Sequence, residues 1–270
     1  MKNRIAIYCV AYRSYDALRD YLKSVETAAL KTKEAAEVSV FVADNTDDGV
    51  QDVDFPTEAV TLRVFPFHEN LGYFGGIGKM MKEVRPDDFD FVIVSNVDLL
   101  LSADFFEKLT AHRWAATTGW IAPRIYSEQE GRDKNPKILH RYSARSLRIH
   151  LALWSHPWLK RLYNLTLYRQ KKFVQHEPGD IYAGHGSLIV LTGEYFRRCG
   201  AISYPVFLFC EEIYLAEECM KKGLTVTYAP ELQVEDGEHV STGKMSFGQY
   251  CRYNADAISY ILKTYYPASE

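Results

Sequence analysis

An asparagine and an aspartate end a mostly apolar stretch of this chain. The residues from Phe89 to Ser95 are mostly Phe, Val and Ile, and Asn96-Val97-Asp98 follow directly. A carboxylate at the carboxyl end of a buried strand lies where open α/β sheets bind ligands. With its amide neighbour, Asp98 could hold a Mg²⁺ or Mn²⁺ ion whose other ligands are water and substrate phosphate. A plain turn is the alternative, because Asn and Asp also bond their own backbone.

A second acidic motif, Glu211 and Glu212, begins a predicted helix that runs to about Lys222. The stretch before it, Phe207 to Cys210, is apolar, and partial burial raises the pKa of a carboxylate toward the working pH of a general base. Repulsion between the two neighbouring carboxylates acts in the same direction. An ordinary acidic first turn is the alternative, because the helix dipole favours negative charge there. We predict Glu212 as a general base and Glu211 as a ligand of an acceptor hydroxyl.

Three more side chains follow predicted strands. Tyr12 ends the first strand and could stack on a nucleotide base or belong to the core. Asp44 follows the second strand and could accept a hydrogen bond from a ribose hydroxyl or a base, or form an Asx turn. His239 follows the last strand and could bind a metal, meet a diphosphate or pair with the acidic residues before it. Each is a candidate ligand contact with a structural alternative.

A glycine-rich stretch runs from Gly72 to Gly78 and precedes a helix. Its Gly-x-x-Gly-Gly-x-Gly spacing differs from the Gly-x-Gly-x-x-Gly of dinucleotide-binding folds, and it follows the third predicted strand instead of the first. This disfavours an oxidoreductase. We predict that Gly75 and Gly76, with Asn70 nearby, allow the backbone to approach the sugar or phosphate of a donor. A tight loop for helix packing is the alternative.

These motifs need a framework of strands and helices to position them. Apolar runs predict strands at residues 4–11, 38–43, 61–67, 89–95, 186–191 and 225–229. Helical patterns follow Ser14 and cover residues 75–84, 104–112 and 211–222, with further helices from about Gly193 and from a capping box at Ser246. Continuous apolar strands are typical of sheets covered on both faces. We therefore predict an α/β fold with a doubly wound, mostly parallel central sheet flanked by helices.

Length and composition restrict the class of protein. The 270 residues, 47% of them apolar, can bury a full core. Five cysteines without a Cys-x-x-Cys pair, and no recognisable signal sequence, predict a reduced, cytoplasmic protein. No apolar run approaches the roughly 20 residues of a membrane span.

Positive charge is concentrated in an insertion at residues 134–176, which holds ten Lys and Arg and no acidic residue. Six apolar residues in it recur at helical spacing: Leu147, Leu151, Trp154, Trp158, Leu162 and Leu165. A basic amphipathic helix suits an anionic membrane surface. Packing on its own protein or on a second subunit is the alternative. Nucleic-acid binding is disfavoured, because aromatic residues at helical spacing are typical of a buried face.

Several of these pieces match one family in order. They are Tyr12 in an Ala-Tyr-Arg strand end, Asp44-Asn45, residues 70–76, Asn96-Val97-Asp98, Gly186-Ser187, Glu211-Glu212, and His239 with Ser241. The chain resembles family 2 inverting glycosyltransferases of the GT-A fold, especially the rhamnosyltransferase-like branch. The match runs from about residue 5 to about residue 241 and leaves out the insertion.

The resemblance implies roles for the matching residues. Tyr12 and Asp44 would contact the base and ribose of the donor, Asp98 and His239 would bind metal or diphosphate, and Glu212 would be the catalytic base. The chain departs from the family at two positions. Asn96 replaces the first carboxylate of the common Asp-x-Asp, which lowers the expected metal affinity. Glu212 replaces an aspartate, so the base is one methylene longer.

The sequence therefore predicts a metal-dependent, inverting hexosyl- or deoxyhexosyltransferase. It would move a sugar from a nucleoside diphosphate donor to a saccharide, including a lipid-linked one, in cell-surface polysaccharide or glycolipid assembly. Residues 1–125 would form the nucleotide-sugar-binding lobe and residues 126–270 the acceptor-binding lobe of one continuous domain. The expected location is the cytoplasm, with a peripheral position on the inner membrane face. A sugar-nucleotide nucleotidyltransferase and a non-catalytic saccharide-binding protein are the alternatives.

Overall fold

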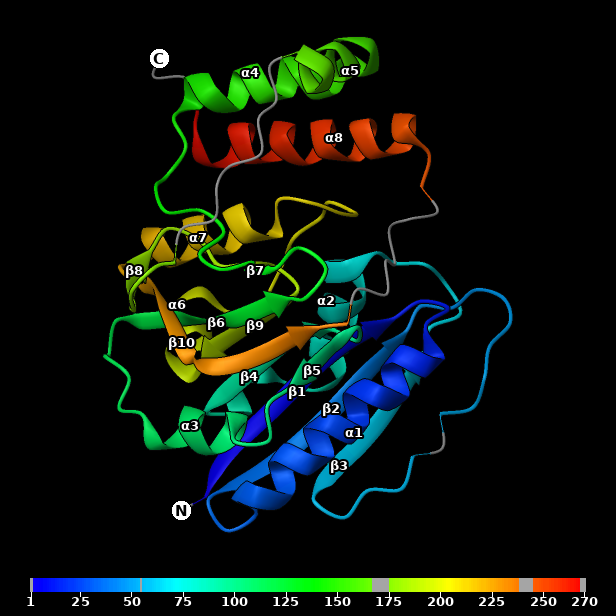
Figure 1. Cartoon of the computed structure of the whole chain (residues 1–270), viewed down its shortest axis with the longest axis vertical. Helices are drawn as coiled ribbons and strands as arrows, with labels where there is room; N and C mark the ends of the chain where they lie inside the picture. Colours follow the sequence, from blue (N-terminus) through cyan, green and yellow to red (C-terminus); the bar gives the residue numbers. More distant parts are fainter. Residues whose placement is uncertain (1, 54, 167–174, 238–244, 268–270) are drawn as a thin grey trace.

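The computed structural model describes residues 2–53, 55–166, 175–237 and 245–267 (Figure 1). Its first half alternates strands and helices as predicted, and each strand end lies within two residues of its expected position. The elements are β1 (Asn3–Ala11), α1 (Tyr15–Thr32), β2 (Ala36–Asp44), β3 (Val60–Pro66), α2 (Tyr73–Glu83), a 3₁₀ turn (Pro86–Asp88) and β4 (Phe91–Asn96).

The second half contains four strands that the sequence did not reveal, β5 to β8. Its elements are β5 (Leu99–Leu101), α3 (Phe105–Ala111), β6 (Thr118–Ser127), β7 (Arg132–Asp133), α4 (Ala144–Ser155), α5 (Pro157–Thr166), β8 (Gly179–Ile181), β9 (Leu188–Thr192), α6 (Gly193–Cys199), α7 (Glu211–Lys221), β10 (Thr225–Asp236) and α8 (Phe247–Tyr265). The predicted capping box at the start of α8 is present between Ser246 and Gln249. All five cysteines are free thiols.

One sheet runs through the whole molecule in the order β3-β2-β1-β4-β9-β6-β10-β5. The first four strands of this order are parallel, as predicted. Beyond β4 the sheet is mixed, because β9 is antiparallel to both β4 and β6 while β6 and β10 are parallel. The predicted α/β fold class is therefore confirmed, but the mostly parallel description holds only for the first half.

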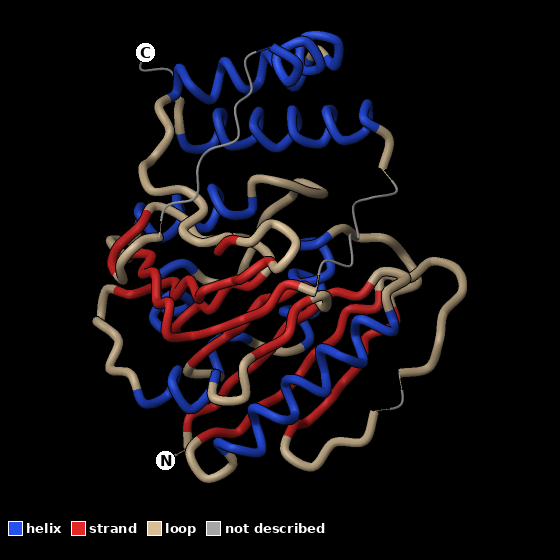
Figure 2. Tube along the Cα trace, viewed as in Figure 1, coloured by secondary structure: helices blue, strands red, loops and turns tan. Residues whose placement is uncertain are grey.

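Helices cover both faces of this sheet (Figure 2), which explains why its central strands β1, β4 and β9 are buried almost continuously. Successive residues of β1 point to opposite faces. Ile5 and Ile7 join a core beneath α1 and α3. Ala6 and Tyr8 join a second core beneath α2, α6 and α7. Over this second core, α8 and then α4 with α5 add an outer helical layer (Figure 1).

The amphipathic helix predicted in the insertion is two helices. The chain breaks at His156, because Pro157 lacks an amide hydrogen and starts α5 as its first residue. The apolar face divides at the same point. Leu147 is buried in the second core, and Leu151 and Trp154 pack against it. The prediction of one continuous face was therefore wrong, and packing on its own protein accounts for the α4 half.

An ion pair between an exposed arginine and a buried glutamate attaches the beginning of this insertion to α7. Glu217 is only 1% exposed. Arg141, just before α4, donates two hydrogen bonds of 2.7 and 2.9 Å to its carboxylate. Tyr182 and Tyr266 donate to the same carboxylate from two other parts of the chain. A bidentate pair with further donors satisfies a buried carboxylate, whereas removal of one partner would leave its charge uncompensated.

Candidate functional site

The Asn96-Val97-Asp98 turn joins β4 to β5 and is held at both ends by backbone hydrogen bonds. The Asn96 amide donates to the Ser187 carbonyl oxygen at 2.8 Å, which ties the turn to the start of β9. The Asp98 carbonyl oxygen accepts from the Gly237 amide at 2.8 Å, which ties it to the end of β10. The side chains of Asn96 and Asp98 are half-buried. The turn is thus fixed while its two polar groups stay accessible.

Glu211 and Glu212 form the first turn of α7 but lie in different environments. Glu211 is 7% exposed, and its carboxylate accepts from the Phe209 amide at 2.9 Å. Burial raises the pKa of Glu211 to about 8, and the neighbouring charge of Glu212 adds to the shift. Glu212 is half-buried, and its Oε1 accepts from the Gly186 amide at 3.3 Å. Burial therefore acts on Glu211, while Glu212 is the more accessible carboxylate.

Tyr73 lies between these two motifs and was missed in the sequence. Its hydroxyl donates to the Gly186 carbonyl oxygen at 3.0 Å. Burial raises its pKa well above the ordinary value, and the charges of both Glu211 and Asp98 add to the shift. Tyr73 is thus close to both carboxylates. No periodicity distinguishes it, because it is the first residue of a glycine-rich helix.

Gly186 and Ser187, which we call the 186–187 junction, are the point where three distant segments meet. Tyr73 reaches the carbonyl of Gly186, Glu212 reaches its amide, and Asn96 reaches the carbonyl of Ser187. A Cβ placed on Gly186 would lie 3.2 Å from Oε1 of Glu212, so the glycine allows this close approach. The metal-site candidate and the candidate base therefore belong to one site.

The loop before α7 carries unusual backbone strain. Phe209 and Cys210 have φ values of 76° and 61°, which is the left-handed region that side chains rarely adopt. Such strain costs on the order of 1–3 kcal/mol per residue and clusters at functional sites. The Tyr204 hydroxyl holds the loop by donating to the Phe209 carbonyl at 2.7 Å. The strained turn aims the Phe209 amide at the Glu211 carboxylate.

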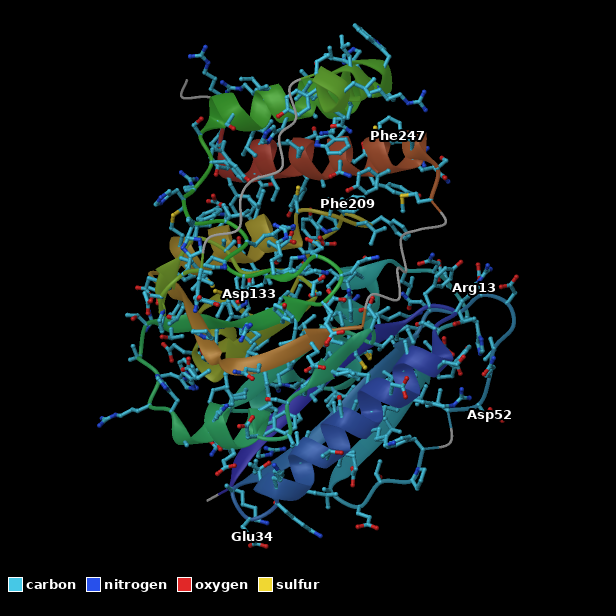
Figure 3. All side chains as sticks on the ribbon, viewed as in Figure 1. Arg13, Glu34, Asp52, Asp133, Phe209 and Phe247 are labelled. Carbon is cyan, nitrogen blue, oxygen red and sulfur yellow. The ribbon has the colours of Figure 1, made fainter. Side chains whose placement is uncertain are left out.

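Aromatic side chains form a wall near Glu212, which we call the aromatic wall: Tyr142, Trp154, Phe209 and Tyr250. The Tyr250 ring centre lies 4.9 Å from that of Phe209 and 5.4 Å from that of Trp154. Burial raises the pKa of Tyr142 and of Tyr250, and the nearby charge of Glu212 adds to both shifts. Figure 3 shows Phe209 below the start of α8, where Phe247 is labelled. The sequence did not reveal this wall, because its residues come from three separate segments.

The ends of β1 and β2 form the other side of the candidate site. Tyr12 is half-buried, and the Arg13 guanidinium lies 5.1 Å from its ring centre. Asp44 is 3% exposed, and its carboxylate accepts from the Tyr15 hydroxyl at 2.8 Å and from the Thr46 amide at 3.0 Å. The second bond is an Asx turn. The structural alternative for Asp44 is therefore present, and a donor contact there stays a prediction.

The predicted donor-binding glycines lie in the first turn of α2 and not in a loop. A Cβ on Gly76 would lie 3.1 Å from Oδ1 of Asn45, and that buried oxygen has no hydrogen-bond partner among the described residues. Gly76 thus allows α2 to pack against the end of β2. Gly75 has more space, with Leu71 as its nearest neighbour at 3.4 Å. The exposed Asn70 accepts from the Gly72 amide at 3.2 Å.

His239 falls outside the described residues, so its role stays a prediction from the sequence. Within the described ranges, no group of three or more His, Cys, Asp or Glu side chains could hold a metal ion. The half-buried Asp98 and Asn96 offer one carboxylate and one amide oxygen. These oxygens fit a Mg²⁺ or Mn²⁺ ion that takes its remaining ligands from water and a diphosphate.

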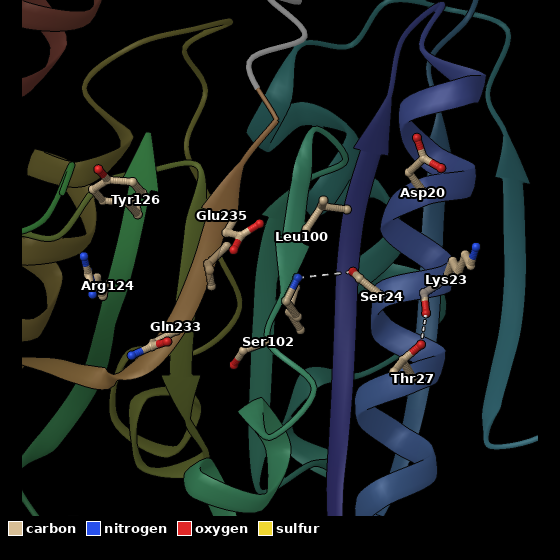
Figure 4. Close-up of a pocket in the computed structure, with 12 residues that line it drawn as sticks. Asp20, Lys23, Ser24, Thr27, Leu100, Ser102, Arg124, Tyr126, Gln233 and Glu235 are labelled. Atoms are coloured by element: carbon tan, nitrogen blue, oxygen red, sulfur yellow. Dashed lines mark hydrogen bonds between the residues drawn. The ribbon is translucent and has the colours of Figure 1, made fainter. Parts of the chain in front are cut away.

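A cavity of about 630 Å³ lies apart from this site, between α1 and strands β5, β6 and β10 (Figure 4). The Ser24 hydroxyl accepts a hydrogen bond from the Leu101 amide at its wall. Arg124 and Tyr126 line its far side. None of the described residues that we predicted for the site lines this cavity.

Comparison with solved structures identifies the fold as GT-A. The chain is similar to GalNAc-T7 solved with UDP, GalNAc and Mn²⁺, with a TM-score of 0.53, 13% identity, and coverage of 93% of this chain and 48% of that one. It is also similar to the Pyrobaculum calidifontis mannosyltransferase PcManGT solved with GDP-Man and Mn²⁺, with a TM-score of 0.52, 14% identity, and coverage of 90% and 59%.

A third similar structure is residues 1–349 of S. aureus TarS, with a TM-score of 0.53, 8% identity, and coverage of 87% of this chain and 60% of that one. The chain thus spans between 48% and 60% of the length of these three structures. No protein-family model matches the sequence, and no characterised protein matches it by sequence comparison. At these identities the similarity establishes the fold.

Proposed function

We propose that this chain is an inverting glycosyltransferase that uses a nucleoside diphosphate sugar. One observation carries the proposal: the 186–187 junction brings Asn96, Tyr73 and Glu212 together at one edge of a GT-A sheet. Such a transfer needs a base for the acceptor hydroxyl and a site that stabilises the departing diphosphate. This arrangement supports the proposal, because it offers one candidate for each of these two tasks.

Glu212 is the proposed base. It takes the proton of the acceptor hydroxyl as that oxygen attacks the anomeric carbon and the bond to the diphosphate breaks, so that the diphosphate leaves with the electron pair. Attack on the face opposite the leaving group inverts the anomeric carbon. Glu211 keeps a proton at neutral pH because burial raises its pKa, which leaves it able to donate a hydrogen bond to an acceptor oxygen.

Asp98 and His239 are the proposed residues that hold a divalent metal, and Asn96 would orient Asp98 or a metal-bound water on the donor side. When bound, Mg²⁺ or Mn²⁺ would neutralise negative charge on the donor diphosphate. With one carboxylate, the protein holds the ion weakly until the diphosphate supplies further oxygens. GalNAc-T7 and PcManGT, which share the fold, were both solved with Mn²⁺.

The remaining predicted residues complete the donor side. Tyr12 and Asp44 would contact the base and ribose, and Asn70, Gly75 and Gly76 would lie near the sugar or phosphate. The acceptor is a saccharide, including a lipid-linked one, that meets the aromatic wall above Glu212. Tyrosine, tryptophan and phenylalanine rings present apolar faces to sugar rings and, for the first two, a polar group at the edge. We place this activity in cell-surface polysaccharide or glycolipid assembly, on the rhamnosyltransferase-like branch, with a hexose or deoxyhexose as the transferred sugar.

The experiment is turnover of UDP-, dTDP- and GDP-sugars with and without Mn²⁺, in the presence of a panel of saccharide acceptors. We expect release of a nucleoside diphosphate that depends on acceptor. Glu212→Gln should lower kcat on the order of 10²–10⁴-fold and leave donor affinity by calorimetry nearly unchanged. Full activity of Glu212→Gln would remove Glu212 from the mechanism.

Two further assays, one with a nucleoside triphosphate and a sugar phosphate and one of saccharide binding, separate the alternatives. Release of pyrophosphate from a nucleoside triphosphate and a sugar phosphate would indicate a nucleotidyltransferase. Binding of a saccharide without turnover of any donor would indicate a non-catalytic binding protein. Either outcome contradicts the proposed transfer.

A further inference from the structure

The outer surface of α5 is apolar, and no element in the described part of the chain covers it. None of its residues is buried. Trp158, Leu162 and Leu165 are 66%, 50% and 85% exposed, and their spacing of four and three residues places them in one stripe along the helix. Half of the large exposed apolar side chains in the described part of the chain lie on α4 and α5. Exposed apolar residues gathered in this way mark an interaction surface.

The charge around this stripe is of one sign. The helical residues 144–166 include Arg145, Arg148, Lys160 and Arg161 and no acidic residue. Both arginines of α4, and Arg161 on α5, are exposed. The occupant of the surface must therefore combine an apolar interior with a negative surface.

We propose that α5 docks this protein on an anionic lipid bilayer. Trp158, Leu162 and Leu165 enter the interface, and Arg145, Arg148 and Arg161 meet the lipid headgroups, as in amphipathic helices that lie in the membrane plane. In the described part of the chain, no helix combines the length and the apolarity that crossing a bilayer would require. In this proposal α5 lies on the bilayer surface, since its 10 residues are too few to cross one.

A second copy of the chain suits this surface less well. A symmetric dimer brings the same patch of both subunits together, so arginines would face arginines without an acidic partner on either helix. An anionic membrane has no such repulsion. Each Lys or Arg near it contributes roughly a fivefold increase in partitioning, which screening by salt reduces.

The position of α5 also relates the surface to the aromatic wall. The Lys160 ammonium lies 4.3 Å from the centre of the Trp154 ring, and Trp154 packs against Tyr250. The Arg161 guanidinium lies 5.0 Å from the centre of the Phe247 ring at the start of α8. Docking through α5 therefore places the acceptor side of the candidate site next to the bilayer. The docking itself does not depend on the proposed transferase activity.

Flotation of the full chain with lipid vesicles tests the proposal. We expect the protein to float with phosphatidylcholine vesicles that contain phosphatidylglycerol, and to remain at the bottom with phosphatidylcholine alone. High salt should weaken the binding. Leu162→Glu with Leu165→Glu should weaken partitioning on the order of tenfold or more, because two apolar side chains no longer enter the interface. Arg161→Glu with Arg145→Glu should weaken it as well.

The matched control is Leu30→Glu with Met220→Glu. It also replaces two exposed apolar residues, 45% and 44% exposed, but they lie on α1 and α7. This variant should float like the unchanged protein. A blue shift of tryptophan emission on vesicle addition should also be lost in Trp158→Phe. Circular dichroism and thermal unfolding would show that each variant is folded.

Three results would overturn the proposal. The first is absence of flotation with anionic vesicles, and the second is equal flotation of the unchanged protein and the Leu162→Glu, Leu165→Glu variant. The third is a concentration-dependent dimer, measured by light scattering, that forms in the unchanged protein and in the control variant but not in the Leu162→Glu, Leu165→Glu variant. The last result would identify the stripe as a contact between two copies of the chain.

Discussion

Gly72 packs directly against Phe207, and this contact joins the glycine-rich segment to the loop before α7. Gly72 has a φ of 72°, and a Cβ there would lie 2.2 Å from the carbonyl oxygen of Phe207. A residue with a side chain would have to adopt this left-handed φ and also avoid the Phe207 carbonyl oxygen, so one of the two backbone segments would have to move. The donor side and the carboxylate pair therefore depend on one glycine.

Gly72→Ala should destabilise the fold by more than about 2 kcal/mol, because left-handed strain of roughly 1–2 kcal/mol adds to the clash. Gly75→Ala is the matched control for stability. Its new Cβ would meet Leu71 at an ordinary 3.4 Å, and alanine favours the helix. Urea unfolding of both variants checks this. Equal stability of the two variants would contradict the importance of the Gly72 contact.

Asp98→Asn should remove the effect of metal on nucleotide binding. With the only carboxylate of the Asn96-Val97-Asp98 turn neutralised, Mn²⁺ should no longer increase the affinity for a nucleoside diphosphate in calorimetry. Asp104→Asn is the control, because Asp104 pairs with Lys108 at the start of α3. An unchanged Mn²⁺ effect in Asp98→Asn would exclude Asp98 as a metal ligand.

The raised pKa of Glu211 predicts a specific pH dependence of stability. The folded protein holds this proton up to about pH 8, whereas an unfolded glutamate releases it near its ordinary value of 4.5. The folded state therefore binds more protons between these values, and this group's contribution to stability falls as pH rises through that window. Glu211→Gln should be less sensitive to pH and melt higher than the unchanged protein at pH 9. Thermal unfolding at pH 5, 7 and 9 tests this, and parallel curves for both proteins would rule it out.

Tyr250→Ala should weaken acceptor binding and leave donor binding intact. The ring of Tyr250 supports both Phe209 and Trp154 in the aromatic wall. Loss of the ring should raise KM for the acceptor on the order of tenfold, since an aromatic contact contributes roughly 0.5–1.5 kcal/mol beyond its buried area. Tyr250→Phe keeps the ring and should restore most of the affinity. If the donor KM rose instead, the wall would belong to the donor side.

The first half of the fold could be predicted because its signals are local. Each strand of the parallel half is rich in apolar residues, and the polar residues that follow it are adjacent in sequence. Asn96, Asp98, Glu211 and Glu212 were placed correctly at the ends of elements for this reason. The capping box at Ser246 is equally local, since it involves two residues three positions apart.

The rest depended on partners that sequence patterns do not specify. An apolar run indicates burial but not strand direction, so the antiparallel β9 between β4 and β6 could not be read from it. The contact between Tyr73 and the 186–187 junction joins residues 113 positions apart in the sequence, so no local pattern could predict it. Phe209 and Cys210 have left-handed backbone conformations, but neither is a glycine or an asparagine, the residues that usually indicate this conformation in a sequence.

The bidentate pair between Arg141 and Glu217 has a consequence for how the molecule would respond to a surface. Glu217 lies on the same helix as Glu212, and Arg141 leads directly into α4. Separation of the pair would leave the buried Glu217 carboxylate without its counter-charge, so the pair resists movement of the segment before α4 away from α7. If α5 docks on a bilayer as proposed, this ion pair would resist separation of the docked helices from α7, the helix that carries Glu212.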